Sequence, residues 1–478
     1  MNEMIARASA DQASASDPGT SAFVSANAGT GKTKLLTDRV LRLLLAGAPA
    51  DGVLCVTYTR TAAAEMRNRI FKQLASWATI SATDLGEDLE KMGINMPSQA
   101  VRKKARSLFA EILDNDDGPR VETVHSFCQS ILRRFPIEAG IAPHVKLVEE
   151  AEQQQLMAIA RTNILVNPSP ELVAAVMQIA EVSSEINIEE ILNNFVSRDL
   201  GLQDGDCLAR IEAHFRDDLG VIDASSSDAD VSAVLAQIDD EKLRAVAKIL
   251  QASDGSANIN RGAKMDVFLA QDSSNRIEKW SFLVDALFSA GKPRSKLSNA
   301  AMRKALPDID NIQRQIITLV KPLLLDKAAQ LCRDRTLSLY QLAIAFHEEY
   351  NRLKAQRGLL DYNDLISRTN DLLAVSEAAQ WVAWKLDNGI QHLLIDEAQD
   401  TSPAQWKLLR HLIDGFFDDD GTLMQSANQP ELPERTVFAV GDFKQSIYSF
   451  QGADPMVMNQ NRSDLSSSAT AVGAGFRD

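Results

Sequence analysis

The sequence is short of several features, and each shortage excludes a class of protein. No run of about 18 or more apolar residues occurs, so the sequence predicts no membrane-spanning helix and no membrane partner. The four cysteines are scattered and lack the CxxC spacing of zinc or redox motifs. Two of them lie inside apolar or aromatic runs, as small core residues do. What remains is an ordinary globular composition, and the length of 478 residues indicates about two to four domains.

Positive charge is also scarce. The formal net charge is −15, which excludes a surface that is basic everywhere. Much of the acidity lies in loop-like clusters, such as residues 114–117 and 418–420, so the sequence still allows a local basic and aromatic groove for nucleic acid. The first 16 residues are polar, rich in alanine and serine, and lack the apolar core of a secretory signal. We therefore expect a cytoplasmic protein.

Strand and helix patterns alternate near both ends of the chain but not in its middle. From about Pro136 to Arg357, helical periodicity dominates and strand patterns nearly vanish. The buried-strand patterns are residues 23–25, 53–57, 121–124, 392–396 and 436–440. Such alternation predicts a parallel sheet that binds ligands at the carboxyl ends of its strands. We predict an α/β core formed by residues 1–135 and 357–478, interrupted by a large all-helical insertion, residues 136–356.

A small-residue loop between the first strand and its helix has the composition of a P-loop. Small residues let backbone N–H groups surround a phosphate, and the start of the following helix adds positive potential. The lysine would reach the β- and γ-phosphates, and the threonine hydroxyl would hold Mg²⁺. The predicted ATP-binding residues are Ala26, Asn27, Ala28, Gly29, Thr30, Gly31, Lys32 and Thr33. Ala26 stands where the general pattern has its first glycine.

A second phosphate-site motif follows the strand at residues 392–396. Asp396 would anchor Mg²⁺, and Glu397 would orient and deprotonate the attacking water. Both motifs must serve one nucleotide, so we expect Lys32 to lie near this acidic pair although the helical insertion separates them in the sequence. The expected cofactors are ATP and Mg²⁺.

These two motifs and five further segments resemble the N-terminal part of UvrD/Rep-type superfamily 1A DNA helicases, and most of all the helicase–nuclease proteins of the AddA type. The AxAGxGKT form of the P-loop is itself a UvrD-like variant. The further segments are the glutamine at position 12, residues 57–67 (motif Ia), residues 123–127 (TxHSF), residues 360–366 (DFxDL) and residues 440–453 (motif III). The resemblance implies a RecA-like P-loop NTPase core.

The resemblance also implies roles for single residues. Gln12 would read adenine, with a solvated glutamine as the alternative, and Gln445 would sense the γ-phosphate as part of the catalytic set. The implied contacts to single-stranded DNA are Tyr58, Arg60, Thr123, His125, Tyr448 and Phe450.

Several of these residues have a second interpretation. Tyr58 could be a core tyrosine, and Thr123 could cap a helix with His125 exposed on its first turn. Asp361 and Asp364 could be structural, because acidic residues at a helix start satisfy its dipole. Gln451 stands where relatives have an arginine, which puts the contacts of that arginine in doubt.

The function implied is that of a 3′→5′ helicase or translocase in double-strand-break repair and recombination. Its partners would be single-stranded or duplex-end DNA and the second subunit of an AddAB-type complex. Alternatives are a RecB-like or other UvrD-like helicase, or a non-motor DNA-binding or assembly module; a small-molecule kinase would not need the TxHSF segment. Because no second motor domain or nuclease residues are recognised, we expect this chain to bind ATP–Mg²⁺ but to hydrolyse it poorly alone.

Overall fold

The computed structural model describes residues 12–25, 31–114, 118–166, 168–180, 185–197, 202, 205–219, 231–272, 275–374, 379, 381–382, 385, 389–416, 435–442, 455–471 and 475–477. The chain divides into two compact units. The first consists of Met1–Ala160, Asn193–Leu200 and Glu349–Asp478, and the second of Arg161–Leu192 and Gly201–Glu348.

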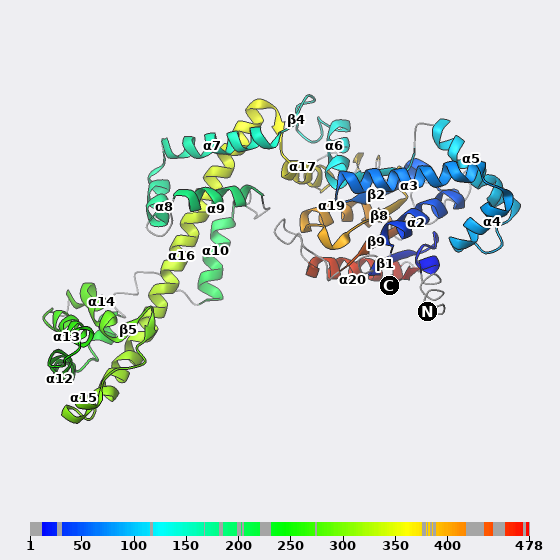
Figure 1. Ribbon diagram of the computed structural model, residues 1–478. Coiled ribbons are helices and arrows are strands. Elements are labelled where there is room, and N and C mark those ends of the chain that lie inside the picture. The colour runs from blue at the N-terminus through cyan, green and yellow to red at the C-terminus, as the bar shows by residue number, and fades with distance from the viewer. Residues whose placement is uncertain are drawn as a thin grey trace. The chain divides into compact units, whose positions relative to one another are not determined.

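A six-stranded parallel sheet forms the centre of the first unit. Its order is β10-β1-β9-β8-β2-β3, so strands from opposite ends of the chain, β1 and β9, lie side by side (Figure 1). The strands are β1 (Ser21–Ser25), β2 (Val53–Thr57), β3 (Arg120–Thr123), β8 (His392–Ile395), β9 (Thr436–Gly441) and β10 (Phe476–Arg477). The predicted parallel α/β core is therefore confirmed.

Alternate residues of each strand enter two separate hydrophobic cores. In β8, Leu393 and Ile395 pack in one core and Leu394 in the other. This period of two explains why the central strands are apolar throughout, since a parallel sheet is covered on both faces.

Each core is completed by its own set of helices. The helices beside Leu394 are α2 (Lys32–Ala46), α3 (Arg60–Thr79), α4 (Ala82–Lys91) and α5 (Gln99–Asp114). Those beside Leu393 are α6 (Val124–Arg134), α17 (Tyr362–Ala374), α19 (Pro403–Ile413) and α20 (Pro455–Ala471). Two short parallel strands, β4 (Lys146–Leu147) and β7 (Leu359–Leu360), pair outside the main sheet.

The second unit is almost entirely helical, as predicted. It contains α8 (Pro170–Ala180), α10 (Cys207–Asp217), α12 (Asp240–Gln251), α13 (Ser256–Leu269), α14 (Asn275–Leu287) and α15 (Ala300–Ala305). Three helices have residues in both units: α7 (Glu150–Val166), α9 (Glu185–Ser197) and α16 (Ile309–Arg357). One departure from an all-helical insertion is a short hairpin of β5 (Phe288–Ser289) and β6 (Lys292–Pro293).

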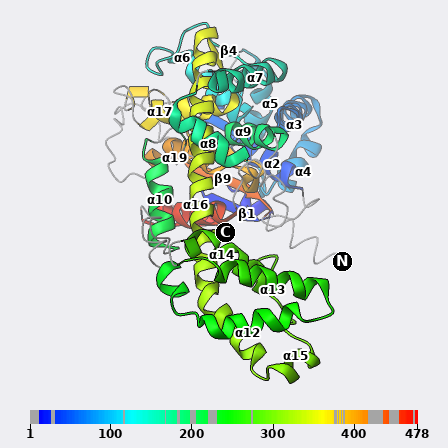
Figure 2. The same cartoon turned by 90° about the vertical axis from the view of Figure 1, so that its left-hand side faces the viewer.

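A buried polar pair stabilises the core of this second unit. The helices α12 and α13 lie side by side there (Figure 2). Arg261 on α13 donates from Nε to the Ala286 carbonyl at 2.7 Å and from Nη2 to Gln313 Oε1 at 2.7 Å. Gln313, which is fully buried, donates in turn to the Leu297 and Ile309 carbonyls. The amide thus satisfies groups that would otherwise be buried without partners.

In the part of the chain that the structure describes, every helix is too short or too polar to cross a lipid bilayer.

Candidate functional site

Lys32 and Glu397 meet at the carboxyl edge of the sheet. Lys32 begins α2 after β1, and Glu397 follows β8; 365 positions separate them in the sequence. The Lys32 Nζ atom nevertheless lies 2.6 Å from Glu397 Oε2. Lys32 is mostly buried, whereas the side chain of Glu397 is 36% exposed. The structure therefore brings the lysine and the acidic pair together, as the two motifs require.

The carboxylates beside this ion pair are under electrostatic strain. Burial, reinforced by the charge of Glu397, raises the pKa of Asp396 to about 6, against the opposing effect of Lys32. Burial and Glu397 likewise raise the pKa of Asp400 to about 6. Three carboxylates therefore share one lysine, and the Asp400 Oδ1 atom is buried with no hydrogen-bond partner in the described part of the chain.

This excess of oxygen ligands fits a magnesium ion. Mg²⁺ in nucleotide sites is held by one or two carboxylates together with phosphate oxygens and water. Asp396 supplies a carboxylate at the strand end, and Thr33 lies next to Lys32 in the first turn of α2. These two residues would hold Mg²⁺ together with a bound triphosphate.

Glu397 adopts a backbone conformation that is rare for its residue type. Its φ of 51° and ψ of 47° place it in the left-handed region, which disfavours residues with a Cβ. The Asp396 carboxylate accepts a hydrogen bond from the Glu397 N–H at 3.0 Å. This turn directs Glu397 toward Lys32 while Asp396 stays at the strand end.

Gln399 was not singled out from the sequence, yet it connects the acidic pair to the end of β9. Its Nε2 atom donates to Glu397 Oε2 at 2.8 Å and to Asp400 Oδ2 at 3.2 Å. Its Oε1 atom accepts from the Asp442 N–H at 2.9 Å. A Cβ on Gly441 would lie only 2.9 Å from that same Oε1 atom, so the close approach requires glycine. The position of Gln399 inside the Asp-Glu-Ala-Gln-Asp motif was the signal available in the sequence.

Gln12 lies beside the P-loop end. The Gln12 Nε2 atom is 3.9 Å from the position that a Cβ on Gly31 would occupy. Gly31 itself has a φ of 86°, which is favourable only for glycine. The geometry is therefore compatible with a glutamine that reads a base next to the phosphate loop.

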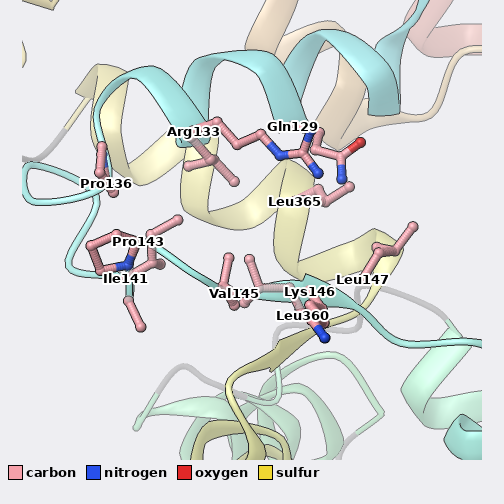
Figure 3. A pocket seen from close by; sticks show the side chains of 12 residues that line it. Gln129, Arg133, Pro136, Ile141, Pro143, Val145, Lys146, Leu147, Leu360 and Leu365 are labelled. Atoms are coloured by element: carbon pink, nitrogen blue, oxygen red, sulfur yellow. The ribbon is translucent and has the colours of Figure 1, made fainter.

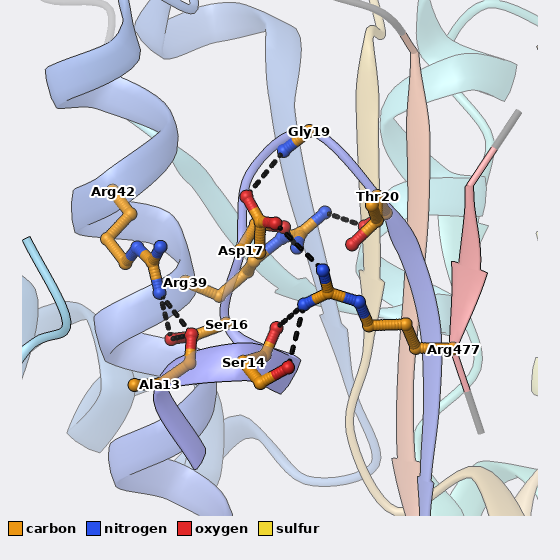
Figure 4. Close-up of polar contacts among 9 residues, drawn as sticks. All are labelled: Ala13, Ser14, Ser16, Asp17, Gly19, Thr20, Arg39, Arg42 and Arg477. Carbon is orange, nitrogen blue, oxygen red and sulfur yellow. Dashed lines mark hydrogen bonds and ion pairs between the residues drawn. The ribbon is translucent and has the colours of Figure 1, made fainter. Parts of the chain in front are cut away.

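Three arginines hold the segment that follows Gln12, as Figure 4 shows. Arg42 on α2 donates to the Ala13 carbonyl at 2.5 Å and to Ser16 Oγ at 2.7 Å. Arg39, also on α2, donates to the Asp17 carbonyl and, at 2.7 Å, to the Thr20 carbonyl.

The third arginine, Arg477 of β10, donates to Ser14 and pairs with Asp17 at 3.2 Å. Arg39 is completely buried, and desolvation lowers its pKa to about 9. The segment of Gln12 is thus fixed to the same helix that carries Lys32.

Several predicted residues lie outside the described residues. They are Ala26, Asn27, Ala28, Gly29 and Thr30 of the P-loop, and Gln445, Tyr448, Phe450 and Gln451 of the motif III segment. Their roles stay predictions.

The predicted DNA-contacting residues gather at the ends of β2 and β3. Tyr58 follows β2 and is half-buried, and the exposed Arg60 begins α3. Thr123 is buried, and its hydroxyl accepts a hydrogen bond from the Ser126 N–H at 3.2 Å. The structure therefore has the helix cap that was the alternative for Thr123, and this cap also explains why Val124 begins α6 instead of ending β3.

His125 is not simply exposed on the first turn of its helix. Its ring packs edge-on against Tyr362, with ring centroids 5.0 Å apart and an angle of 74° between the planes. Burial, and then the charge of Arg60, lower the pKa of His125, so the imidazole is neutral near pH 7. Tyr362 itself is 46% exposed. Sequence reasoning missed this tyrosine as a candidate contact, although it lies in the DFxDL-like segment.

The two aspartates of that segment form a helix cap with a buried lysine. Asp361 and Asp364 each accept the backbone N–H of the other, at 2.8 and 2.9 Å. Lys354, at the end of α16, donates to both carboxylates at 2.7 and 2.6 Å and is 3% exposed. The acidic pair therefore has the capping geometry expected of a structural role.

A small cavity below α6 is too small for a ligand. It holds about 20 Å³ and is lined by side chains of α6, the chain that follows it, β7 and α17 (Figure 3). This volume admits about one water molecule. It is a packing gap and carries no candidate chemistry.

Comparisons with known proteins agree with this geometry. The family model described as UvrD/REP helicase N-terminal domain matches residues 7–466. One relative is the AddA component of the ATP-dependent helicase/nuclease of Latilactobacillus sakei subsp. sakei (strain 23K). It is 24% identical over 488 residues, covering 95% of this chain and 50% of that protein.

Two further relatives have the same name. The protein of Lysinibacillus sphaericus (strain C3-41) is 25% identical, covering 95% of this chain and 37% of its own length. That of Listeria monocytogenes serotype 4b (strain F2365) is 26% identical, covering 91% of this chain and 35% of its own length. The chain spans between about a third and a half of the length of these curated relatives.

Proposed function

The chain belongs to the UvrD/REP helicase family, and we propose that it is the ATP-binding part of a 3′→5′ DNA helicase or translocase. The activity would couple ATP hydrolysis to movement along single-stranded DNA in double-strand-break repair and recombination. The relatives, each named as the AddA component of an ATP-dependent helicase/nuclease, support an AddA-like identity. They also support an AddAB-type partner protein and nuclease activity in the whole protein. Such work on chromosomal DNA would take place in the bacterial cytoplasm.

One observation supports this proposal above the others. The Lys32 and Glu397 side chains are 2.6 Å apart at the carboxyl edge of a parallel sheet, although each belongs to a separate phosphate-site motif. A phosphate cradle, a lysine and an acidic pair at one sheet edge are the parts that ATP hydrolysis needs. A structural ion pair would not require both motifs.

The proposed chemistry follows from these contacts. Triphosphate oxygens compete with Glu397 for the Lys32 ammonium group, so ATP binding releases Glu397 to orient water and accept its proton. Asp396 and Thr33 would hold Mg²⁺, which supplies charge neutralisation to the phosphate oxygens when bound. Gln12 would select adenine, because an amide can both donate to and accept from the base edge.

The proposed DNA surface comprises Tyr58, Arg60, His125 and Tyr362. Exposed aromatic rings stack on bases without sequence preference, and Arg60 offers a phosphate contact. Thr123 is buried, so we propose that it acts by capping α6 and thereby positioning His125. In this proposal residues 1–135 and 357–478 form the ATPase core, and residues 136–356 form the insertion.

A pair of binding assays tests the proposal. A fluorescent ATP analogue with Mg²⁺ and a labelled oligonucleotide are each titrated with the chain. Lys32→Ala is expected to abolish nucleotide binding and to leave DNA binding in the absence of nucleotide intact. Tyr58→Ala is expected to weaken DNA binding by about tenfold, as loss of one base stack predicts, with little change for nucleotide. Equal loss of both ligands in the tyrosine variant would indicate a packing role and contradict the assignment.

The direction of movement needs its own test. Duplexes that carry either a 3′ or a 5′ single-stranded tail are offered with ATP. Unwinding is expected from the 3′ tail alone, and unwinding only from the 5′ tail would overturn the proposed polarity.

A further inference from the structure

A polar cavity opens beside the proposed DNA surface. It has a volume of about 610 Å³, within the range of roughly 300–1,000 Å³ that small-ligand sites occupy. Arg60 and Tyr362 line one part of it, and the first turns of α7 line another with Glu149, Glu150 and Gln154. All of these residues belong to the first compact unit. The cavity can therefore be entered by a ligand that already contacts Arg60 and Tyr362.

The charges of the lining determine which end of a nucleotide can enter. Glu149 and Glu150 are exposed acids, so they repel a phosphate group. Arg60 is the cation of the lining and suits a phosphate. Tyr362 offers a ring for stacking, and its ring is already oriented by the edge contact with His125. A nucleotide is thus favoured with its phosphate at Arg60 and its base directed toward the acids.

The hydrogen-bonding capacity of the acids selects among bases. An ionised carboxylate only accepts hydrogen bonds. Cytosine presents an exocyclic amine that donates to such a group, whereas uracil and thymine present a carbonyl at the same position. An acid facing a carbonyl oxygen is repelled, so the two pyrimidines are expected to differ.

We propose that this cavity is a base-reading pocket that binds one unpaired nucleobase and favours bases with an exocyclic amine. The inference rests on the proposed DNA-binding function and adds a sequence preference to contacts that otherwise tolerate any base. Such a pocket would make the strand pause or bind more tightly where amine-bearing bases enter it.

Oligo-dC and oligo-dU of equal length test the inference, because their bases have the same size and differ chiefly at this edge. At mildly alkaline pH, where cytosine is uncharged, the full chain is expected to bind oligo-dC roughly three- to tenfold more tightly. The double variant Glu149→Gln/Glu150→Gln is expected to bind both within about twofold, since an amide can donate as well as accept. Glu87→Gln/Glu90→Gln, a pair of exposed acids on α4, removes the same charge elsewhere and is expected to keep the preference.

Tyr362→Leu gives a second measurement. It is expected to weaken binding of both oligonucleotides by a similar factor, because stacking does not depend on the amine. Equal affinity of the unmodified chain for oligo-dC and oligo-dU would overturn the inference while leaving the DNA-binding function in place. A preference that persists in the Glu149→Gln/Glu150→Gln variant would also overturn it. Failure to bind either oligonucleotide would reject the inference together with the proposed function.

Discussion

Two clusters in the first unit have nearly the same composition and opposite character. Lys354 lies between Asp361 and Asp364, and Lys32 lies beside Glu397 and Asp396. In the first cluster the carboxylates also accept each other's backbone N–H groups, and the lysine is 3% exposed. In the second cluster, Glu397 is 36% exposed and has a left-handed backbone.

The difference separates a structural ion cluster from a candidate catalytic one. Around Lys354 the buried charges have hydrogen-bonding partners on several sides, so the cluster is complete without a ligand. Around Lys32 a third carboxylate, Asp400, adds negative charge, and burial raises the pKa values of both Asp396 and Asp400. An incomplete cluster of this kind is relieved by a cation and a phosphate, which is the expectation for a ligand site.

Removal of each lysine should have the largest and most contrasting effects. Lys354→Met leaves two buried carboxylates without a cation and is expected to lower the free energy of unfolding by about 3–5 kcal/mol. Lys32→Met leaves Glu397 with water and Gln399, so the expected loss of stability is below about 1 kcal/mol, while ATP affinity falls by about 100-fold. Chemical denaturation and nucleotide titration measure the two effects. Equal destabilisation by the two variants would refute the contrast.

Neutralisation of one aspartate in each cluster should change stability in opposite directions. Asp396→Asn removes a desolvated charge, and the amide oxygen can still accept the Glu397 N–H. Without nucleotide, near pH 7, it is expected to raise the free energy of unfolding by on the order of 2 kcal/mol, because the pKa of Asp396 rises from 3.8 to about 6 on folding.

The matched variant Asp361→Asn loses the charged partner of Lys354 and is expected to destabilise the chain by about 1–3 kcal/mol. Thermal denaturation of both variants without nucleotide checks the signs. A less stable Asp396→Asn variant would show that this carboxylate is structural.

The pH dependence of nucleotide binding sharpens the same comparison. A carboxyl group whose pKa is raised on folding contributes stability at low pH, and that contribution disappears as the pH rises from about 4 through about 6. The ionised form, present above about pH 6, is the form that can ligate Mg²⁺. We expect Mg²⁺-dependent ATP affinity to fall by about tenfold between pH 7 and pH 5 from this group.

The nucleotide also titrates in this range, so the control is the same titration with Asp396→Asn. The variant should bind more weakly at pH 7 and show a smaller change with pH. An identical pH profile in both proteins would rule out protonation of Asp396 as the cause.

Local sequence patterns predicted the sheet and the two phosphate motifs because each depends on neighbouring residues. Apolar runs such as residues 53–57 and 436–440 became the strands β2 and β9 almost to the residue. The spacing of Asp361 and Asp364 similarly indicated a helix start, which the reciprocal cap confirms. Thr123 had two possible roles in the sequence, and its cap is visible in the structure.

Contacts between distant residues could not be predicted in the same way. Nothing near Lys354 in the sequence shows that its ammonium group reaches Asp361, because the approach depends on how α16 ends against β7 and α17. The contact of His125 with Tyr362 and the link from Gln399 to Asp442 likewise arise from tertiary packing. Sequence reasoning therefore found the motifs and missed the residues that connect them.

Gln399 provides the smallest and most specific test. Its amide connects Glu397 to the end of β9, which leads into the predicted motif III segment. Gln399→Leu is expected to reduce the effect of a non-hydrolysable ATP analogue on single-stranded DNA affinity from about fivefold to nearly none, because the two ends of the link no longer share a side chain. Gln313→Leu also removes a buried amide, in the second unit, and should lower stability by a similar amount while keeping the effect of the analogue. Gly441→Ala displaces Gln399 without changing it and should reproduce the loss. A Gln399→Leu chain that still responds fully to the analogue would mean that the nucleotide signal reaches the DNA surface by another route.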